Sequence, residues 1–599
     1  MAKHEGTEMT EMQWDLSVLV DSTDPEGIKS QLEEFVEESS RFAELYRGRI
    51  QGLSAGELKG LLDAKDSLSL KYEGVLTYCS LRFQADQGDP VATSLNDASS
   101  RAANRVGQNM AFLSIDLGKL LLSRPELVQD PVLAEYRHYL ERYLRSAPHF
   151  LSESEEKIII AKDRSGIRAW TKLQSKWLSA KTFRPMFDGK EVPLTIGEAV
   201  PYIYSPDREV RRAVYHALGS TLGEDQLLWS DALRAIWTDH QEMCRLRHYP
   251  STLTPSLIDN DVEEGTIMTL MEVVRRNASV CQRYFRLKAS LLGLDVLGNW
   301  DLRAPLPDAR DEVRSWQEAK ELLISVYSGF DPQYGQWVQE MFDLRRLDGE
   351  LRKGKRTGAF CDTWVHGRSA FILSSFNGHI NDVYTLAHEL GHGVHAYLYT
   401  RAQNPSNCQV SLCVAECGSM FGELLLTERL LREAGTKEEK RQLLVKVLNS
   451  FTQVVFQEGF RFFFEMELAK AVDEGGYLDG ETISGMWVDA QRSIYGTSVE
   501  YLPENRWDWA RFPHHYFSDI RFYEYPYVFA QLFVFALYRL YKEQGREFVP
   551  RLKNLLSAGS SRSAAELAAE LGFDINEEGF WQKGIDQAEE YLMQLEELS

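Results

Sequence analysis

The sequence lacks the features that would assign it to a membrane or to a disulfide-bonded secreted class. Among its 599 residues there is no uninterrupted apolar run of about 18 residues, the length that a transmembrane helix needs. Residues 1–13 are polar and charged and have neither the apolar core nor the cleavage site of a secretory signal. Cysteine is scarce, and its seven copies form no disulfide-like pattern. These absences predict a reduced, cytoplasmic protein without a membrane partner.

Positive charge is also in short supply. The chain carries 67 Lys and Arg residues against 89 Asp and Glu residues, which gives a formal net charge of −22 at pH 7. An acidic surface repels phosphate backbones and anionic lipids. We therefore expect no nucleic-acid partner.

Only 19 prolines interrupt the chain, and most of it follows a helical pattern. Apolar residues recur at spacings of three and four over residues 27–46, 57–83 and 208–218, with polar residues between them. A length of 599 residues exceeds what one core usually supports. The sequence thus predicts a mainly α protein of more than one lobe, with a boundary near residues 185–200.

Two segments depart from the helical pattern. Residues 183–195 contain a turn at 187–190 between short extended pieces. Residues 358–378 predict one or two strands that end in a turn at Asn377 and Gly378, immediately before the chemical motif. If residues 370–374 form an edge strand, an extended peptide could pair with its backbone; an ordinary buried strand is the alternative.

The motif is His-Glu-x-x-His, at His388, Glu389 and His392. On a helix, residues four apart share a face, so both histidines can direct ring nitrogens at one zinc ion. Glu389 follows the first histidine and is placed to act as the general base for the attacking water. Asp382 is placed to cap or begin this helix.

A third ligand is needed to complete such a site. The metzincin extension is absent, because the positions that it would occupy hold His395 and Leu398. Residues 410–429 read as a second helix, in which Glu416 is flanked by small residues that permit close helix packing. A glutamate in so apolar a stretch needs a cationic partner, which zinc would be. Glu416 is therefore the expected third ligand, with Glu423 as the alternative.

Other possible ligands fit less well. His395 lies on the same helical face as His388. It could contact a zinc ligand or the substrate, or it could be a structural histidine in the core. Cys408, Cys413 and Cys417 lack the Cys-x-x-Cys pairs that thiolate zinc sites favour, and are read as small buried thiols.

These motifs, with several shorter blocks, resemble the oligoendopeptidase F family within the wider thimet oligopeptidase and neurolysin family of zinc peptidases. The resemblance covers roughly residues 150–590 in patches. The blocks that carry it are residues 354–360, 371–373, 382–392, 414–419, 513–514 and 522–527.

The resemblance implies a mainly α, two-lobed, clam-like zincin of the neurolysin type, with a deep channel and a small β-sheet next to the zinc helix. It implies an N-terminal helical lobe over residues 1–190 and a catalytic lobe over residues 191–599. It also implies one zinc ion per chain and cleavage inside short peptide substrates.

The same resemblance implies roles for individual residues. Glu416 becomes the third zinc ligand, and His514 with Tyr523 or Tyr527 contacts the substrate and the oxyanion. The segment departs from the thimet pattern, because it carries Glu524 between its tyrosines and its offset from His514 differs. The division of work between the two tyrosines is therefore left open.

The expected function is that of a zinc metalloendopeptidase, an oligoendopeptidase in which Glu389 is the general base. One alternative is a metallocarboxypeptidase or dipeptidyl carboxypeptidase on a similar scaffold, for which Arg368 or Arg521 would bind the C-terminal carboxylate of the substrate. A second is a catalytically inactive peptide-binding protein. The intact Glu389 argues against the second, because a binding protein needs no general base.

Overall fold

The computed structural model describes residues 11–307 and 313–599. The chain divides into two compact units, each built from three segments. Unit 1 comprises Met1–Phe150, Asp311–Arg429 and Leu540–Leu571, and unit 2 comprises Leu151–Arg310, Leu430–Arg539 and Gly572–Ser599. The sequence-based division into residues 1–190 and 191–599 follows family resemblance rather than compactness, and it stays a prediction, as does the channel.

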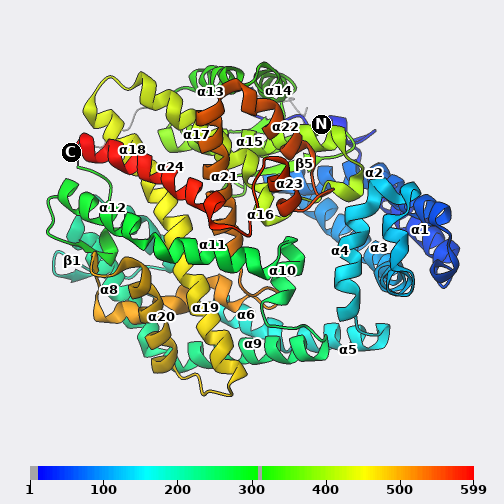
Figure 1. The fold of residues 1–599 in the computed structure, drawn as a ribbon, viewed down its shortest axis with the longest axis horizontal. Helices are drawn as coiled ribbons and strands as arrows, with labels where there is room; N and C mark the ends of the chain where they lie inside the picture. The colour runs from blue at the N-terminus through cyan, green and yellow to red at the C-terminus, as the bar shows by residue number, and fades with distance from the viewer. Residues whose placement is uncertain (1–10, 308–312) are drawn as a thin grey trace, which may run out of the picture. The chain divides into compact units, whose positions relative to one another are not determined.

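Unit 1 is mostly helical. Its long helices α1, α2 and α3 pack on one another side by side (Figure 1). Its helices are α1 (Pro25–Tyr46), α2 (Ala55–Ala85), α3 (Pro90–Ser123), α4 (Arg137–Ser146), α13 (Trp316–Phe330), α14 (Pro332–Asp343), α15 (Ile380–Ala402), α16 (Leu412–Ala415), most of α17 (Cys417–Glu433), α22 (Val549–Ser557) and α23 (Ala564–Glu570).

Unit 2 is helical as well. Within it α18 packs on α24, and α19 packs on α20 (Figure 1). Its helices are α5 (Glu153–Asp163), α6 (Ile167–Ala180), α7 (Ile196–Ala199), α8 (Arg208–Glu224), α9 (Gln226–Leu246), α10 (Thr254–Asn260), α11 (Glu264–Arg276), α12 (Ala278–Leu291), α18 (Lys437–Phe451), α19 (Glu458–Asp473), α20 (Gly480–Tyr495), most of α21 (Tyr525–Gln544) and α24 (Glu578–Glu597).

Local sequence explains where many of these helices begin. In α2, the Ser54 hydroxyl accepts a hydrogen bond from the Glu57 backbone N–H, while the Glu57 carboxylate accepts one from the Ser54 N–H. This capping box satisfies two of the free N–H groups at the helix start. The same arrangement begins α5 at Ser152, where the sequence indicates a helix start. The prediction of a mainly α protein is confirmed.

Within residues 11–307 and 313–599, the strands are short and form three small sheets. A two-stranded antiparallel hairpin joins β1 (Met186–Phe187) to β2 (Lys190–Glu191). Its two turn residues, Asp188 and Gly189, both have positive φ, as a tight two-residue hairpin turn requires. The predicted turn is therefore confirmed. A second sheet pairs β3 (Leu297–Gly298) with β7 (Val499–Glu500).

The third sheet lies against α15 and consists of β4 (Leu347–Asp348), β5 (Phe360–Trp364) and β6 (Ser369–Leu373). The strand order is β4-β6-β5, with β6 parallel to β4 and antiparallel to β5. The prediction of strands before the motif is confirmed, and of the two alternatives for residues 370–374 the structure shows the ordinary buried strand rather than the edge strand. β6 is the central strand, so both of its sides are already paired and its residues are buried. An edge of this sheet is instead formed by β5.

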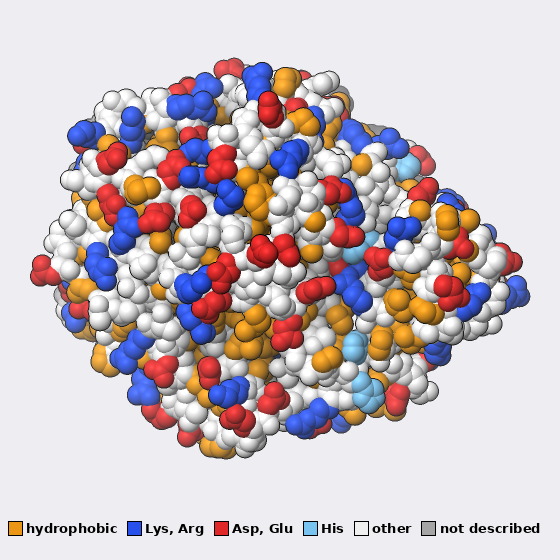
Figure 2. Space-filling model, viewed as in Figure 1, with side chains coloured by type: hydrophobic (Ala, Val, Ile, Leu, Met, Phe, Trp, Pro, Cys, Tyr) orange, Lys and Arg blue, Asp and Glu red, His pale blue; other side chains and the backbone are white. Residues whose placement is uncertain are grey.

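The surface carries charge of both signs. Figure 2 shows Lys and Arg side chains interspersed with Asp and Glu side chains over the visible face. The acidic excess of the chain is thus spread over this face rather than gathered into one patch. In the part of the chain that the structure describes, no helix combines the length and the apolar character that crossing a bilayer requires.

Candidate metal centre

The histidine motif lies in the middle of α15. The helix begins after His379, and the Asp382 carboxylate accepts hydrogen bonds from the backbone N–H groups of Asn377 and His379. Asp382 thereby caps the start of the helix, as its position in the sequence predicts. One turn apart on the same face, the rings of His388 and His392 lie 4.9 Å from each other between centroids.

Glu416 reaches the motif from a break between two helices. The prediction of one continuous helix over residues 410–429 is wrong in this detail, because α16 ends at Ala415 and α17 begins at Cys417. At the break, the Ser419 hydroxyl lies 2.6 Å from Glu416 Oε2 and 3.0 Å from its carbonyl oxygen. These bonds hold the carboxylate at the N-terminal end of α17, where the helix dipole favours negative charge.

Glycines allow α15 and α17 to approach closely enough for the histidines and Glu416 to meet. A Cβ atom added to Gly391 would overlap the carbonyl oxygen of Gly418, and one added to Gly418 would overlap the carbonyl oxygen of Gly391. Gly422, one turn further along α17, leaves room for the Tyr327 hydroxyl. The small residues around Glu416 therefore serve the close packing that the sequence indicates.

The donor atoms converge on one point. His388 Nε2 and His392 Nε2 each lie 3.3 Å from Glu416 Oε2. A ligand atom from each of these three residues lies within 4.8 Å of the others, so the group could hold a metal ion. Glu423 lies outside this group, because its Oε1 is 2.7 Å from the opposite nitrogen, Nδ1, of His388. It accepts the Nδ1–H and leaves Nε2 free to bind a metal, as carboxylates next to metal-bound histidines commonly do.

The electrostatics of the cluster favour positive charge beside the two carboxylates. Burial alone would lower the pKa of His388, but the carboxylates of Glu416 and Glu423 raise it to about 10. Burial would raise the pKa of Glu416, but the two histidines hold it far below its ordinary value. Burial raises the pKa of Glu389, which lies beside these groups without being one of the three converging donors. Two imidazoles and one carboxylate are a donor set that zinc favours, so the residues fit a divalent cation.

The remaining candidates near the site are structural. His395 is 2% exposed and packs edge-on against Tyr399, and burial lowers its pKa to about 4. It is therefore a neutral core residue and no contact for substrate. Cys413 and Cys417 are buried free thiols, and Cys408 is a half-buried one.

A second set of predicted residues lies in unit 2. His514 belongs to a short 3-10 helix (Pro513–Tyr516), and its ring centroid is 4.9 Å from that of Tyr523 and 6.5 Å from that of Tyr527. Both tyrosines are half-buried, whereas Tyr525 between them is buried and its hydroxyl donates to the Ser256 carbonyl oxygen. The structure thus brings His514, Tyr523 and Tyr527 together, and their predicted contact with substrate stays a prediction.

Arg521 is not placed to bind the C-terminal carboxylate of a substrate, as a carboxypeptidase would require. This side chain is 2% exposed, and its guanidinium donates a hydrogen bond to the His515 carbonyl oxygen. Arg368 is exposed at the turn between β5 and β6.

Sequence reasoning missed the role of Glu423 as the partner of His388; the signal was its position seven residues, two helical turns, after Glu416.

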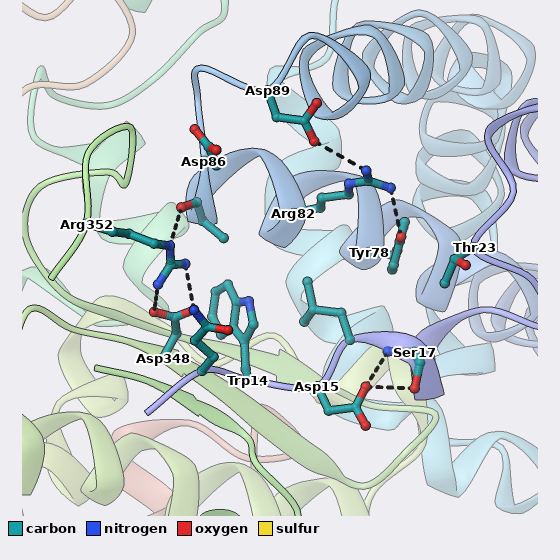
Figure 3. A pocket seen from close by; sticks show the side chains of 13 residues that line it. Trp14, Asp15, Ser17, Thr23, Tyr78, Arg82, Asp86, Asp89, Asp348 and Arg352 are labelled. Atoms are coloured by element: carbon teal, nitrogen blue, oxygen red, sulfur yellow. Dashed lines mark hydrogen bonds and ion pairs between the residues drawn. The ribbon is translucent and has the colours of Figure 1, made fainter. Parts of the chain in front are cut away.

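A separate pocket of about 350 Å³ lies in unit 1, between the N-terminal segment, α2 and the loop after β4. Figure 3 shows that its two arginines are already paired, Arg352 with Asp348 and Arg82 with Asp89. None of the three converging donors lines it. We therefore do not assign the site to this pocket.

Known proteins are similar to this chain over most of its length. A sequence model described as Oligopeptidase F matches residues 125–183. Oligopeptidase PepF of Bacillus subtilis is 26% identical over 562 residues, which cover 92% of this chain and 82% of that protein. An oligoendopeptidase F homolog of Lactococcus lactis is 27% identical over 606 residues, which cover 100% of this chain and 99% of that protein.

Solved structures share the fold. The crystal structure of a Chlamydophila abortus chain superposes with a TM-score of 0.89 at 23% identity and covers 99% of both chains. Oligoendopeptidase-F from Enterococcus faecium superposes with a TM-score of 0.69 at 22% identity, covering 94% of this chain and 98% of that one. The sequence model of peptidase family M3 matches residues 201–587, well over half of the chain and all the residues discussed above as candidate donors, so this protein belongs to peptidase family M3.

Proposed function

We propose that this family M3 peptidase is a zinc metalloendopeptidase that hydrolyses internal bonds of short peptides. The observation that carries the proposal is the convergence of three donors: two histidine Nε2 atoms, each 3.3 Å from one oxygen of Glu416. The names of the relatives, oligopeptidase and oligoendopeptidase, support the preference for short peptides.

His388, His392 and Glu416 would hold the zinc ion. When bound, zinc supplies a Lewis acid that lowers the pKa of water and polarises a peptide carbonyl. Glu423 keeps His388 in the form that has its lone pair on Nε2. Three residues would thus bind the metal, and Glu423 would orient one of them.

Glu389 would move the protons. Its carboxylate neighbours the donors on α15 and is buried, which raises its pKa toward the range in which a general base works well. It would take a proton from the attacking water and then give that proton to the departing amine. His514 and the hydroxyl of Tyr523 or Tyr527 would donate hydrogen bonds to the substrate oxygen that gains negative charge.

The edge strand β5 offers a way to bind an extended peptide. β5 packs against α15, and its side away from β6 is an edge of the sheet. A peptide that pairs with this edge would be held through its backbone, which explains a loose preference for side chains.

The test is a digest of a peptide of about ten residues that is blocked at both ends. The zinc-loaded enzyme should release internal fragments, identified by mass, and the matched variant Glu389→Gln should bind zinc but lose nearly all activity. The same segment within a folded protein should resist cleavage, because unfolding it costs about 5–15 kcal/mol.

Each rival has its own outcome. A carboxypeptidase would leave the blocked peptide intact and trim one with a free C-terminus. An inactive binding protein would retain both peptides without cleaving either. Near-normal turnover by zinc-loaded Glu389→Gln would exclude Glu389 as the general base.

A further inference from the structure

The carboxylate of Glu524 forms a buried pair with His514. Its Oε1 lies 3.0 Å from His514 Nδ1. The Glu524 side chain is 1% exposed, whereas that of His514 is 30% exposed. One ring nitrogen of a half-exposed histidine is therefore bound to an acid in the protein interior, and Nε2 is the nitrogen left for other partners.

Neighbouring groups keep Glu524 ionised despite its burial. Burial would raise the pKa of Glu524, but the hydrogen bond with His514 and the charge of Arg461 hold it below the ordinary value. Arg461 lies 2.6 Å from Glu458 and 3.9 Å from Glu524. Burial raises the pKa of Glu458 well above the ordinary value.

The backbone on both sides of Glu524 is anchored separately. Phe522 is fully buried with φ of 55°, and its backbone N–H donates to Glu465 at 3.3 Å. A large residue at positive φ needs such support from its surroundings. On the other side, the Tyr525 hydroxyl donates to the Ser256 carbonyl oxygen at 3.0 Å. These anchors fix where Glu524 can reach, independently of its bond to His514.

An ionised carboxylate is an acceptor only, and this determines what His514 can do. It pairs with Nδ1 only when that nitrogen carries a proton. An amide in the same place could donate as well as accept, and would allow Nδ1 to be the unprotonated nitrogen.

We propose that Glu524 is a positioning residue that keeps His514 protonated at Nδ1 and directs Nε2 to the substrate. The proposal rests on the proposed function, in which His514 contacts the substrate. The charged or titratable groups around this pair come from α19, from the short helix of His514, from the loop before α21 and from the first turn of α21: Glu458, Arg461, Glu465, His515, Arg521, Tyr523 and Tyr527.

The main test compares Glu524→Gln with the wild type. The variant should lower kcat about 10- to 100-fold, as loss of a histidine's carboxylate partner does in metal sites, while KM changes less than threefold. Zinc content should be unchanged. In a His514→Gln background, adding Glu524→Gln should cause no further loss, because the acid acts only through the histidine. Glu524→Asp keeps the charge and should restore part of the activity.

Glu465→Gln is the matched control. Glu465 is a buried carboxyl of the same cluster that bonds to backbone and not to His514. Its variant keeps a side-chain oxygen that can accept the Phe522 N–H, so the anchor is retained and kcat and KM should stay at their wild-type values. A Glu524→Gln enzyme with kcat within twofold of the wild type, or losses that add in the double variant, would overturn the proposal.

A spectroscopic measurement tests the pair without any activity. In ¹⁵N-histidine-labelled wild-type protein near neutral pH, the His514 signals, assigned by their absence in His514→Gln, should show a protonated Nδ1. An unprotonated Nδ1 would overturn the proposal even if Glu524→Gln fails to fold. If the zinc-loaded wild type cleaves no peptide, the proposed function fails, and this measurement still decides the role of Glu524.

Discussion

Glu416 and Glu423 face different nitrogens of the same histidine. Glu416 Oε2 lies 3.3 Å from Nε2 of His388, and Glu423 Oε1 lies 2.7 Å from its Nδ1. Only the first can share a metal ion with the histidines, whereas the second orients the ring and raises its basicity. Their removal should therefore have unequal effects.

We expect Glu416→Ala to lose zinc almost completely, and Glu423→Ala to weaken zinc binding about 10- to 100-fold. Zinc titration against a chelator of known affinity measures both variants, with circular dichroism to show that each is folded. If Glu423→Ala loses as much zinc as Glu416→Ala, then Glu423 is itself a ligand and the assignment above is wrong.

The buried carboxyl of Glu465 makes the free energy of unfolding depend on pH. Burial, followed by the charge of Glu524, raises the pKa of this carboxyl from 4.5 to about 8. Between these values the unfolded chain releases the proton and the folded chain keeps it. Stability therefore falls as pH rises from about 5 to about 8, by at most about 1.4 kcal/mol per pH unit.

We expect Glu465→Gln to remove this dependence, because the amide does not ionise. Urea unfolding at pH 5, 6, 7 and 8 should show the variant gaining stability relative to the wild type as pH rises. Every other group titrates in both proteins, so the difference between them isolates Glu465. Parallel profiles for the two proteins would show that this carboxyl is already ionised in the folded state.

Single residues were predictable where chemistry follows from local geometry. The spacing of His388 and His392 places them on one helical face, and the small residues around Glu416 indicate a close contact. The pairing of His514 with Glu524 was not predictable in this way. Nine residues, most of them irregular chain, lie between the two, and their meeting depends on how that loop is anchored.

At the scale of elements, the crossing of α15 and α17 brings the donors together. Gly391 and Gly418 meet backbone to backbone, with no space for a side chain on either. A methyl group there would push the two helices apart and separate Glu416 from the histidines. The same change at Gly60 in α2 meets no atom within 4 Å, so it serves as a control.

We expect Gly418→Ala to destabilise the protein by about 1–3 kcal/mol through overpacking and to weaken zinc binding. Gly60→Ala should stabilise it by about 0.5–1 kcal/mol, because alanine favours the helix more than glycine does. Thermal unfolding and zinc titration of both variants check this. Unchanged zinc affinity in Gly418→Ala would mean that the crossing tolerates a methyl group.

Element type was predictable, but element pairing was not. The residues of β6 show strand character in the sequence, yet nothing local reveals that β4 and β5 pair on both sides of it. Likewise, the helical pattern over residues 410–429 does not show the break at Glu416, whose carboxylate and carbonyl oxygens both lie within hydrogen-bonding distance of the Ser419 hydroxyl. The pairing of β6 depends on strands that lie elsewhere in the sequence. The break at Glu416 depends on which of several hydrogen bonds a side chain makes.

At the scale of the whole molecule, the chain passes repeatedly between its two units. Leu540–Leu571 belongs to unit 1, although the residues on either side belong to unit 2. Local periodicity predicts that this segment is helical, but not which core its helices join. The three converging donors all belong to unit 1, so a metal ion would link elements of that unit alone.

Removal of the metal should therefore affect the two units differently. Bound zinc adds stability of about 2.7 kcal/mol at a concentration one hundred times its Kd, and only where it binds. Treatment with a chelator should increase hydrogen exchange in α15 and at the start of α17, where buried carboxylates and histidines lose their cation. Peptides from α19 and α20 in unit 2 should change little. In Glu416→Ala, the pattern should resemble the metal-free protein with or without zinc. An equal increase across both units would show that the metal supports the whole chain rather than the crossing of α15 and α17.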